Sequence, residues 1–168
     1  MTARGIRASL FVEELDRLRL NTIVTVPDTH QRTLLAALGR DQRFRVVTAA
    51  TEDEGVGICA GLWWGGVDPL LLIQHAGVFA SVNTLRGIGL DMGIPITMLV
   101  GLYGRDPAVA PEDSRGSMNR MVLPLLEHLG IQHELIETAN DLPALERIKA
   151  QAQVDARPAA AIVGAETI

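Results

Sequence analysis

Three consecutive carboxylates, Glu52, Asp53 and Glu54, follow the first residue of the stretch TEDEGVGICAGLWWGG, which is otherwise rich in small and apolar residues. The pattern predicts a helix over 52–64, so the acids occupy its first turn. Carboxylates there are stabilised by the helix dipole, and a carboxylate can also exchange a proton with a bound molecule. A helix-capping role is favoured for Asp53 and Glu54, and Glu52 needs a separate explanation.

The glycines of this stretch suggest a nucleotide-binding loop, but two observations argue against it. Residues 55–61, GVGICAG, have the spacing G-x-G-x-x-x-G rather than the dinucleotide-binding G-x-G-x-x-G. The preceding carboxylates would also repel a pyrophosphate at the helix N-terminus. The glycines are better explained as sites of close packing between this helix and a neighbour.

The elements that position these residues alternate along the chain. Apolar or β-branched runs predict strands over 22–26, 44–48, 69–73, 95–100, 131–136 and 159–163. Helical patterns cover 6–20, 30–38, 52–64, 78–92, 118–129 and 141–156. Continuously apolar strands are typical of a parallel sheet that is buried on both faces. We therefore predict a three-layer α/β/α fold, flavodoxin- or Rossmann-like, with a mostly parallel central sheet and residues 1–168 as a single domain.

In such folds, ligands bind at the carboxyl ends of the strands. The residues that follow the predicted strands include 27–30, 50–52, 74–77 and the long polar loop 101–117. These stretches contain most of the distinctive polar residues of the chain. We expect them to form one rim of the sheet.

Composition narrows the classes of function. The net charge is −5 and the chain has no basic cluster, which argues against nucleic-acid binding. No apolar run reaches the roughly 18 residues of a membrane span, and the N-terminus lacks a secretory apolar region. The single cysteine, Cys59, excludes an internal disulfide and fits the cytoplasm. The apolar fraction of 48% hints at a large protein–protein interface.

Several short motifs in consistent order resemble the pyrimidine-binding domain of thiamine-diphosphate-dependent 2-oxo acid decarboxylases. Glu52, followed nine residues later by Gly61 and then by Leu62, is similar to the segment of the family's activating glutamate. Residues 74–83, from Gln74-His75-Ala76-Gly77 to Asn83, resemble the glutamine-x-x-glycine to asparagine stretch of phosphonopyruvate and sulfopyruvate decarboxylases. Residues 26–29 resemble their Val-Pro-Asp-Ser turn. The resemblance covers about 6–136, and it is strongest to the sulfopyruvate decarboxylase alpha subunit and the phosphonopyruvate decarboxylase N-terminal domain.

The resemblance implies an enzyme that converts a small anionic 2-oxo acid, of the sulfopyruvate or phosphonopyruvate type, to an aldehyde and CO₂. The cofactor would be thiamine diphosphate, and a glutamate at its N1′ would promote loss of the C2 proton. The chain has no Gly-Asp-Gly motif for the diphosphate and Mg²⁺. The resemblance therefore implies a separate diphosphate-binding beta subunit, in a heterotetramer or a larger assembly.

The resemblance also implies roles for individual residues. Catalytic roles fall to Glu52 and Asp28, and cofactor contacts to Glu52, Pro27, Gln74, Gly77 and Asn83. Substrate contacts fall to His30, His75, Arg105 and Arg115. His75 stands where the family has asparagine, and the loop 101–117 lacks the family's pattern, so the substrate acid stays open.

Each role has a structural alternative. Asp28 could form a turn, His30 could cap a helix or face solvent, and Gln74 and His75 could satisfy a loop. Asn83 could be a buried helix residue and the two arginines solvated, while Trp63 and Trp64 are expected in the core or an interface.

The alternative function is a non-catalytic, flavodoxin-like binding or regulatory module that has inherited the fold. Glu52 distinguishes the two hypotheses, because such a module has no reason to keep an acid at this position.

Overall fold

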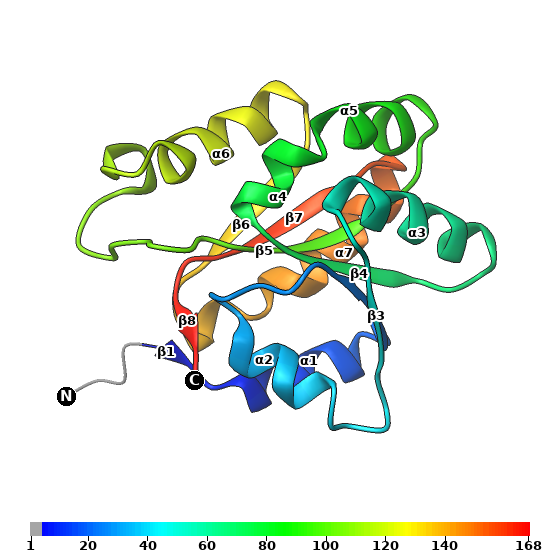
Figure 1. The fold of residues 1–168 in the computed structure, drawn as a ribbon, viewed down its shortest axis with the longest axis horizontal. Helices are drawn as coiled ribbons and strands as arrows, with labels where there is room; N and C mark the ends of the chain where they lie inside the picture. Colours follow the sequence, from blue (N-terminus) through cyan, green and yellow to red (C-terminus); the bar gives the residue numbers. More distant parts are fainter. Residues whose placement is uncertain (1–4) are drawn as a thin grey trace.

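The central element of the protein is a six-stranded parallel sheet with strand order β3-β2-β4-β5-β7-β6 (Figure 1). It is seen in a computed structural model that describes residues 5–168, so the first four residues of the predicted domain lie outside it. The strands are β2 (Thr22–Thr25), β3 (Arg45–Thr48), β4 (Pro69–Gln74), β5 (Thr97–Gly101), β6 (Gln132–Ile136) and β7 (Ala159–Val163). Every pair of neighbouring strands is parallel. The predicted fold class is confirmed.

Helices cover both faces of the sheet, and Figure 1 shows α3, α4, α5 and α6 on one side with α1 and α2 on the other. The helices are α1 (Ala8–Arg17), α2 (Arg32–Leu38), α3 (Glu52–Trp64), α4 (His75–Ala80), α5 (Val82–Thr84), α6 (Ser117–His128) and α7 (Ala144–Asp155). No helix within 5–168 is long and apolar enough to cross a membrane.

Strand β4 explains why the sheet needs two helical layers. Its residues Leu70 and Leu72 belong to the core cluster that includes α1, α2 and α7. The alternate residues Leu71 and Ile73 belong to the cluster that includes α3 and α6. All four side chains are fully buried, because successive residues of a strand point to opposite faces. The continuous apolar run in the sequence is the consequence.

The segment 78–92 differs from the single helix that its pattern predicts. It is divided among the end of α4, the short α5 and a π-helix over Leu85–Asp91. At the first junction the carbonyl of Gly77 accepts both from the Ser81 backbone N–H at 3.0 Å and from the Ser81 hydroxyl at 2.7 Å. Farther on, Gly89 lies directly against the ring of Pro158, where a side chain would not fit. Local packing therefore overrides the helical periodicity.

The structure contains short elements that the sequence patterns do not indicate. Strands β1 (Gly5–Ile6) and β8 (Glu166–Thr167) form a separate two-stranded parallel sheet. The predicted helix over 6–20 consequently begins only at Ala8. Two-residue strands are too short to show an alternating pattern, and this pair is fixed by hydrogen bonds between the chain ends.

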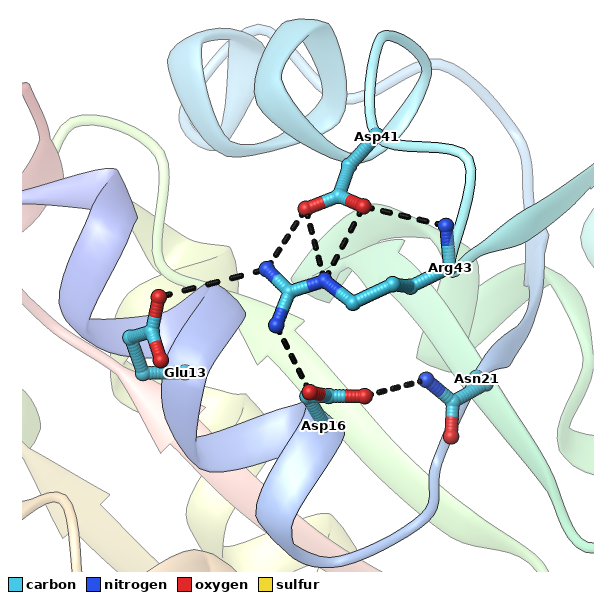
Figure 2. Close-up of polar contacts among 5 residues, drawn as sticks. All are labelled: Glu13, Asp16, Asn21, Asp41 and Arg43. Carbon is cyan, nitrogen blue, oxygen red and sulfur yellow. Dashed lines mark hydrogen bonds and ion pairs between the residues drawn. The ribbon is translucent and has the colours of Figure 1, made fainter.

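An exposed ionic cluster around Arg43 joins α1 to the loop that precedes β3 (Figure 2). The guanidinium lies 2.6 Å from the Asp41 carboxylate and 2.6 Å from that of Asp16, and 3.9 Å from Glu13. Asp16 also accepts a hydrogen bond from the Asn21 side chain at 2.9 Å. The planar guanidinium can contact these acids at once, which a lysine could not reproduce.

We expect Arg43→Gln to lower the melting temperature in low salt, and to do so less in about 1 M NaCl, where these exposed charges are largely screened. Thermal unfolding at both salt concentrations measures the difference. Arg40→Gln is the control, because Arg40 is exposed in the same loop and forms no ion pair within the described chain. A loss of the same size at both salt concentrations would contradict an electrostatic role.

Candidate functional site

The carboxylate of Asp28, just after β2, is the centre of a buried hydrogen-bond network. Asp28 is 3% exposed. Its Oδ1 accepts from the His30 backbone N–H at 2.8 Å and from the Gln74 side chain at 3.0 Å, while Oδ2 accepts from Gln31 Nε2 at 2.9 Å. Both oxygens are therefore occupied, and the carboxylate links the carboxyl ends of β2 and β4.

Gly101 at the end of β5 leaves the room that this network occupies. The strand register aligns Gly101 with Gln74 of β4. A Cβ atom on Gly101 would lie 2.5 Å from Asp28 Oδ2 and 3.1 Å from Gln31 Nε2. A larger residue at the end of this strand would therefore displace the buried carboxylate.

Two buried histidines border the Asp28 network and present different ring nitrogens. His30 Nε2 lies 3.0 Å from the Val163 carbonyl, so it must donate, and Nδ1 is then an acceptor that has no partner among residues 5–168. His75 Nδ1 accepts from the Ala76 backbone N–H at 3.0 Å, so its proton lies on Nε2. Burial lowers the pKa of both rings below the usual value, and the nearby Asp28 carboxylate opposes this shift. Both histidines are therefore neutral at pH 7.

Glu52 is the first residue of α3, and its side chain lies against the backbone of Gly77 in α4. A Cβ on Gly77 would lie 2.8 Å from Glu52 Oε1 and 2.9 Å from its Cδ. Glu52 is half-buried, and within the described part of the chain no group donates a hydrogen bond to its carboxylate. Packing against Gly77 therefore fixes the position of the Glu52 carboxylate, while no described residue bonds to it.

The two acids that follow Glu52 are engaged with the helix end. Glu54 Oε2 accepts from the Ala50 backbone N–H at 2.6 Å. A hydrogen bond from the Thr51 side chain lowers the pKa of Asp53. Both residues are exposed. Asp53 and Glu54 therefore differ from Glu52 in that their carboxylates are hydrogen-bonded near the helix start, as the sequence interpretation expects.

The segment 74–77 brings the two halves of the site together. Gln74 donates to Asp28, and Gly77, three residues later, contacts Glu52. Pro27 is exposed beside Asp28 at the same rim. The site thus combines one fully bonded carboxylate, two neutral imidazoles and one carboxylate with free acceptor capacity, which are the groups needed for proton transfer and for hydrogen bonding to an anion.

The structure does not bring Asn83, Arg105 and Arg115 into this network. Asn83 is exposed on α5, so its interpretation as a buried helix residue is wrong; its Oδ1 accepts from Arg86 at 3.1 Å. Arg115 is exposed in the loop 101–117. The side chain of Arg105 is only 3% exposed and pairs with Glu137 at 2.7 Å, so its interpretation as a solvated arginine is wrong as well.

Burial also decides the structural roles of His30, Asp28 and the two tryptophans. A solvent-facing role for His30 is wrong, because the residue is 3% exposed, and a capping role is wrong, because its ring bonds to the Val163 carbonyl of β7. The turn expected at Asp28 is present, since its side chain accepts from the backbone two residues later, and it coexists with the buried network. Trp63, in α3, packs against the core cluster that lies between α3 and the sheet, whereas Trp64 is 67% exposed.

Gln31 is the site residue that the sequence interpretation missed. It is fully buried and donates to Asp28 Oδ2, while its own Oε1 has no partner between residues 5 and 168. A sequence signal for Gln31 was available. Gln31 lies three residues after Asp28, and this spacing matches the capping-box pattern at a helix start.

We predict that the protein loses stability as the pH falls below about 6.5, the usual histidine pKa. The folded-state pKa of His30 and His75 is lowered, so below that pH the unfolded chain binds more protons than the native one. Melting temperatures measured from pH 7.5 to pH 5 should decline, and His30→Asn should reduce the slope. His128→Asn, at an exposed histidine, is the control. An unchanged slope in His30→Asn would contradict this explanation.

Comparisons with known proteins agree with the motifs. No protein-family model matches the chain. A sulfopyruvate decarboxylase of Methanosarcina acetivorans is 27% identical over 154 residues, which are 90% of this chain and 38% of that protein. The alpha subunit of sulfopyruvate decarboxylase of Methanothermobacter thermautotrophicus is 35% identical over 83 residues, 49% of this chain and 50% of that subunit. The chain thus covers less than two thirds of the length of these relatives.

Among solved structures, a benzoylformate decarboxylase from Polynucleobacter necessarius has a similar fold. The TM-score is 0.75 at 16% identity, and the match covers 99% of this chain and 31% of that chain. The family resemblance predicted from the motifs is confirmed: the chain is similar in sequence to sulfopyruvate decarboxylases and similar in fold to part of a benzoylformate decarboxylase.

Proposed function

We propose that this chain is the alpha, pyrimidine-binding subunit of a thiamine-diphosphate-dependent decarboxylase. The enzyme would convert a small anionic 2-oxo acid, of the sulfopyruvate or phosphonopyruvate type, to an aldehyde and CO₂. The observation that carries the proposal is the Glu52 carboxylate, which is half-buried against Gly77 and unpaired within residues 5–168. The similarity to sulfopyruvate decarboxylase alpha subunits supports the same activity.

The residues present fit the pyrimidine half of the cofactor. Bound thiamine diphosphate supplies the electron sink for decarboxylation. Glu52 would share a proton with N1′ of the aminopyrimidine, because its carboxylate is the one at this rim without a partner in the described structure. Pro27, Gln74, Gly77 and Asn83 are proposed as further cofactor contacts. Gln74 is held by Asp28 and is therefore fixed before the cofactor binds.

The diphosphate and Mg²⁺ would be held by a separate beta subunit. The 168 residues contain no Gly-Asp-Gly motif that could serve them. The relatives' designation as alpha subunits supports a partner chain. We propose an even-numbered assembly, two of each subunit or larger, since closed symmetry is the usual arrangement of oligomers.

The substrate acid would meet the neutral histidines. His75 offers an N–H at Nε2, because its Nδ1 is occupied by a backbone donor. His30 offers an acceptor at Nδ1 beside the buried Asp28. We propose that His75 donates a hydrogen bond to the substrate, that His30, whose free Nδ1 can only accept, lines the site beside it, and that Asp28 holds the rim in place.

Recognition of the second anionic group is proposed for the loop 101–117. Arg105 and Glu137 line a cavity of about 760 Å³ next to the end of β7. The carbonyl of Val163 in β7 accepts from His30 and from the Leu102 backbone, so this cavity neighbours the histidine. A sulfonate or phosphonate could replace Glu137 as the partner of Arg105. Arg115, exposed in the same loop, could contribute a second guanidinium.

We predict that the purified chain binds thiamine diphosphate and Mg²⁺ weakly or not at all, and that the beta subunit restores tight binding. Titration calorimetry with and without the partner measures this difference. The restored complex should release CO₂ from sulfopyruvate or phosphonopyruvate faster than from pyruvate, which lacks the second anionic group. Tight binding by the chain alone would contradict a divided cofactor site, and the absence of turnover on the whole panel would contradict the enzyme.

A further inference from the structure

Gly77 is buried in α4, and its closest contacts are all with one side chain. The three atoms nearest to a Cβ added there are Cγ, Oε1 and Cδ of Glu52, all closer than 3.0 Å. Real Cβ atoms essentially never come this close to another heavy atom. The present position of the Glu52 side chain is therefore compatible only with glycine at position 77.

No backbone requirement explains this glycine. Glycine is the poorest helix former after proline, so its presence inside α4 needs a reason. The glycines with positive φ in the described chain are Gly66, Gly93, Gly104 and Gly130, and Gly77 is not among them. Its backbone conformation is thus open to any residue. Within the described chain, the contact with Glu52 is the feature that requires glycine at this position.

We propose that Gly77 is a positioning residue that sets where the Glu52 carboxylate lies. The effect of Gly77 on the position of the Glu52 side chain rests on packing alone. Its effect on catalysis rests, in addition, on the proposed function. Any side chain at position 77 would push the carboxylate out of its place between α3 and α4. A proton is shared only over a hydrogen-bond distance of about 2.6–3.2 Å, so a shift of about 1 Å removes the contact.

The packing part is tested on the full chain by a double-mutant cycle. Gly77→Ala should change the melting temperature less favourably when Glu52 is present than when it is absent, because the Glu52 side chain must move to admit the methyl group. In the Glu52→Ala background the same substitution should leave the melting temperature unchanged or raise it, because the clash is absent and alanine is the better helix former. Gly57→Ala in α3, where an added Cβ meets nothing within 4 Å, is the control and should not lower it in either background. Equal changes in both backgrounds would overturn the proposal.

The catalytic part is tested in the complex with the beta subunit, thiamine diphosphate and Mg²⁺. Gly77→Ala should slow hydrogen–deuterium exchange at thiamine C2 by about tenfold or more, up to the roughly 10²–10⁴-fold typical of a lost acid–base group. In the Glu52→Ala background its additional effect should be negligible, because both the carboxylate and the side-chain atoms that clash with the methyl group are absent. Equal factors in both backgrounds would overturn the positioning role.

The two measurements separate this inference from the proposed function. If the wild-type complex neither exchanged C2 nor turned over a 2-oxo acid, the proposed function would fail, and the melting-temperature cycle would still decide whether Gly77 positions Glu52. If C2 exchange were normal in the wild type and unchanged in Gly77→Ala, the proposed function would stand and the positioning role would be wrong.

Discussion

The buried carboxylate of Asp28 is the constraint on which the rest of the site depends. A carboxylate removed from water must have its oxygens hydrogen-bonded, or its burial is too costly. Gln31 and Gln74 are committed to this task, and Gly101 leaves the space for it. Gln74 immediately precedes α4, so the same bond anchors the residue before the helix that carries Gly77.

The acids of the rim have different environments, and these define different roles. Asp28 is saturated with donors and holds β2 and β4 together at their ends. Glu54 and Asp53 are bound to the first turn of α3 and its neighbours. Glu52 alone is held by packing rather than by hydrogen bonds from the described residues, so its carboxylate keeps its capacity to bind a ligand. Of the three consecutive acids, Asp53 and Glu54 thus serve the helix end, and Glu52 is the one available to a ligand.

Sequence patterns predicted the parts of the fold that depend on local or continuous signals. The helix over Glu52–Trp64 and the strand over Ala159–Val163 have the predicted bounds, because apolar runs and small residues define them. The π-helix escaped prediction, and within it Gly89 packs against Pro158, a contact far along the chain that the local pattern does not show. The pairing of Arg105 with Glu137 is likewise set by tertiary structure. The site residues that follow strands were predictable, and their partners were not.

The most direct measurement of the central claim is hydrogen–deuterium exchange at thiamine C2 in the complex with the beta subunit, compared between Glu52→Gln and Glu54→Gln. The amide preserves shape but cannot share the proton, so Glu52→Gln should slow exchange by about 10²–10⁴-fold. Glu54→Gln should exchange at nearly the wild-type rate, because Glu54 is engaged with the Ala50 backbone. Exchange at the wild-type rate in Glu52→Gln would contradict the assignment of Glu52 as the activating acid.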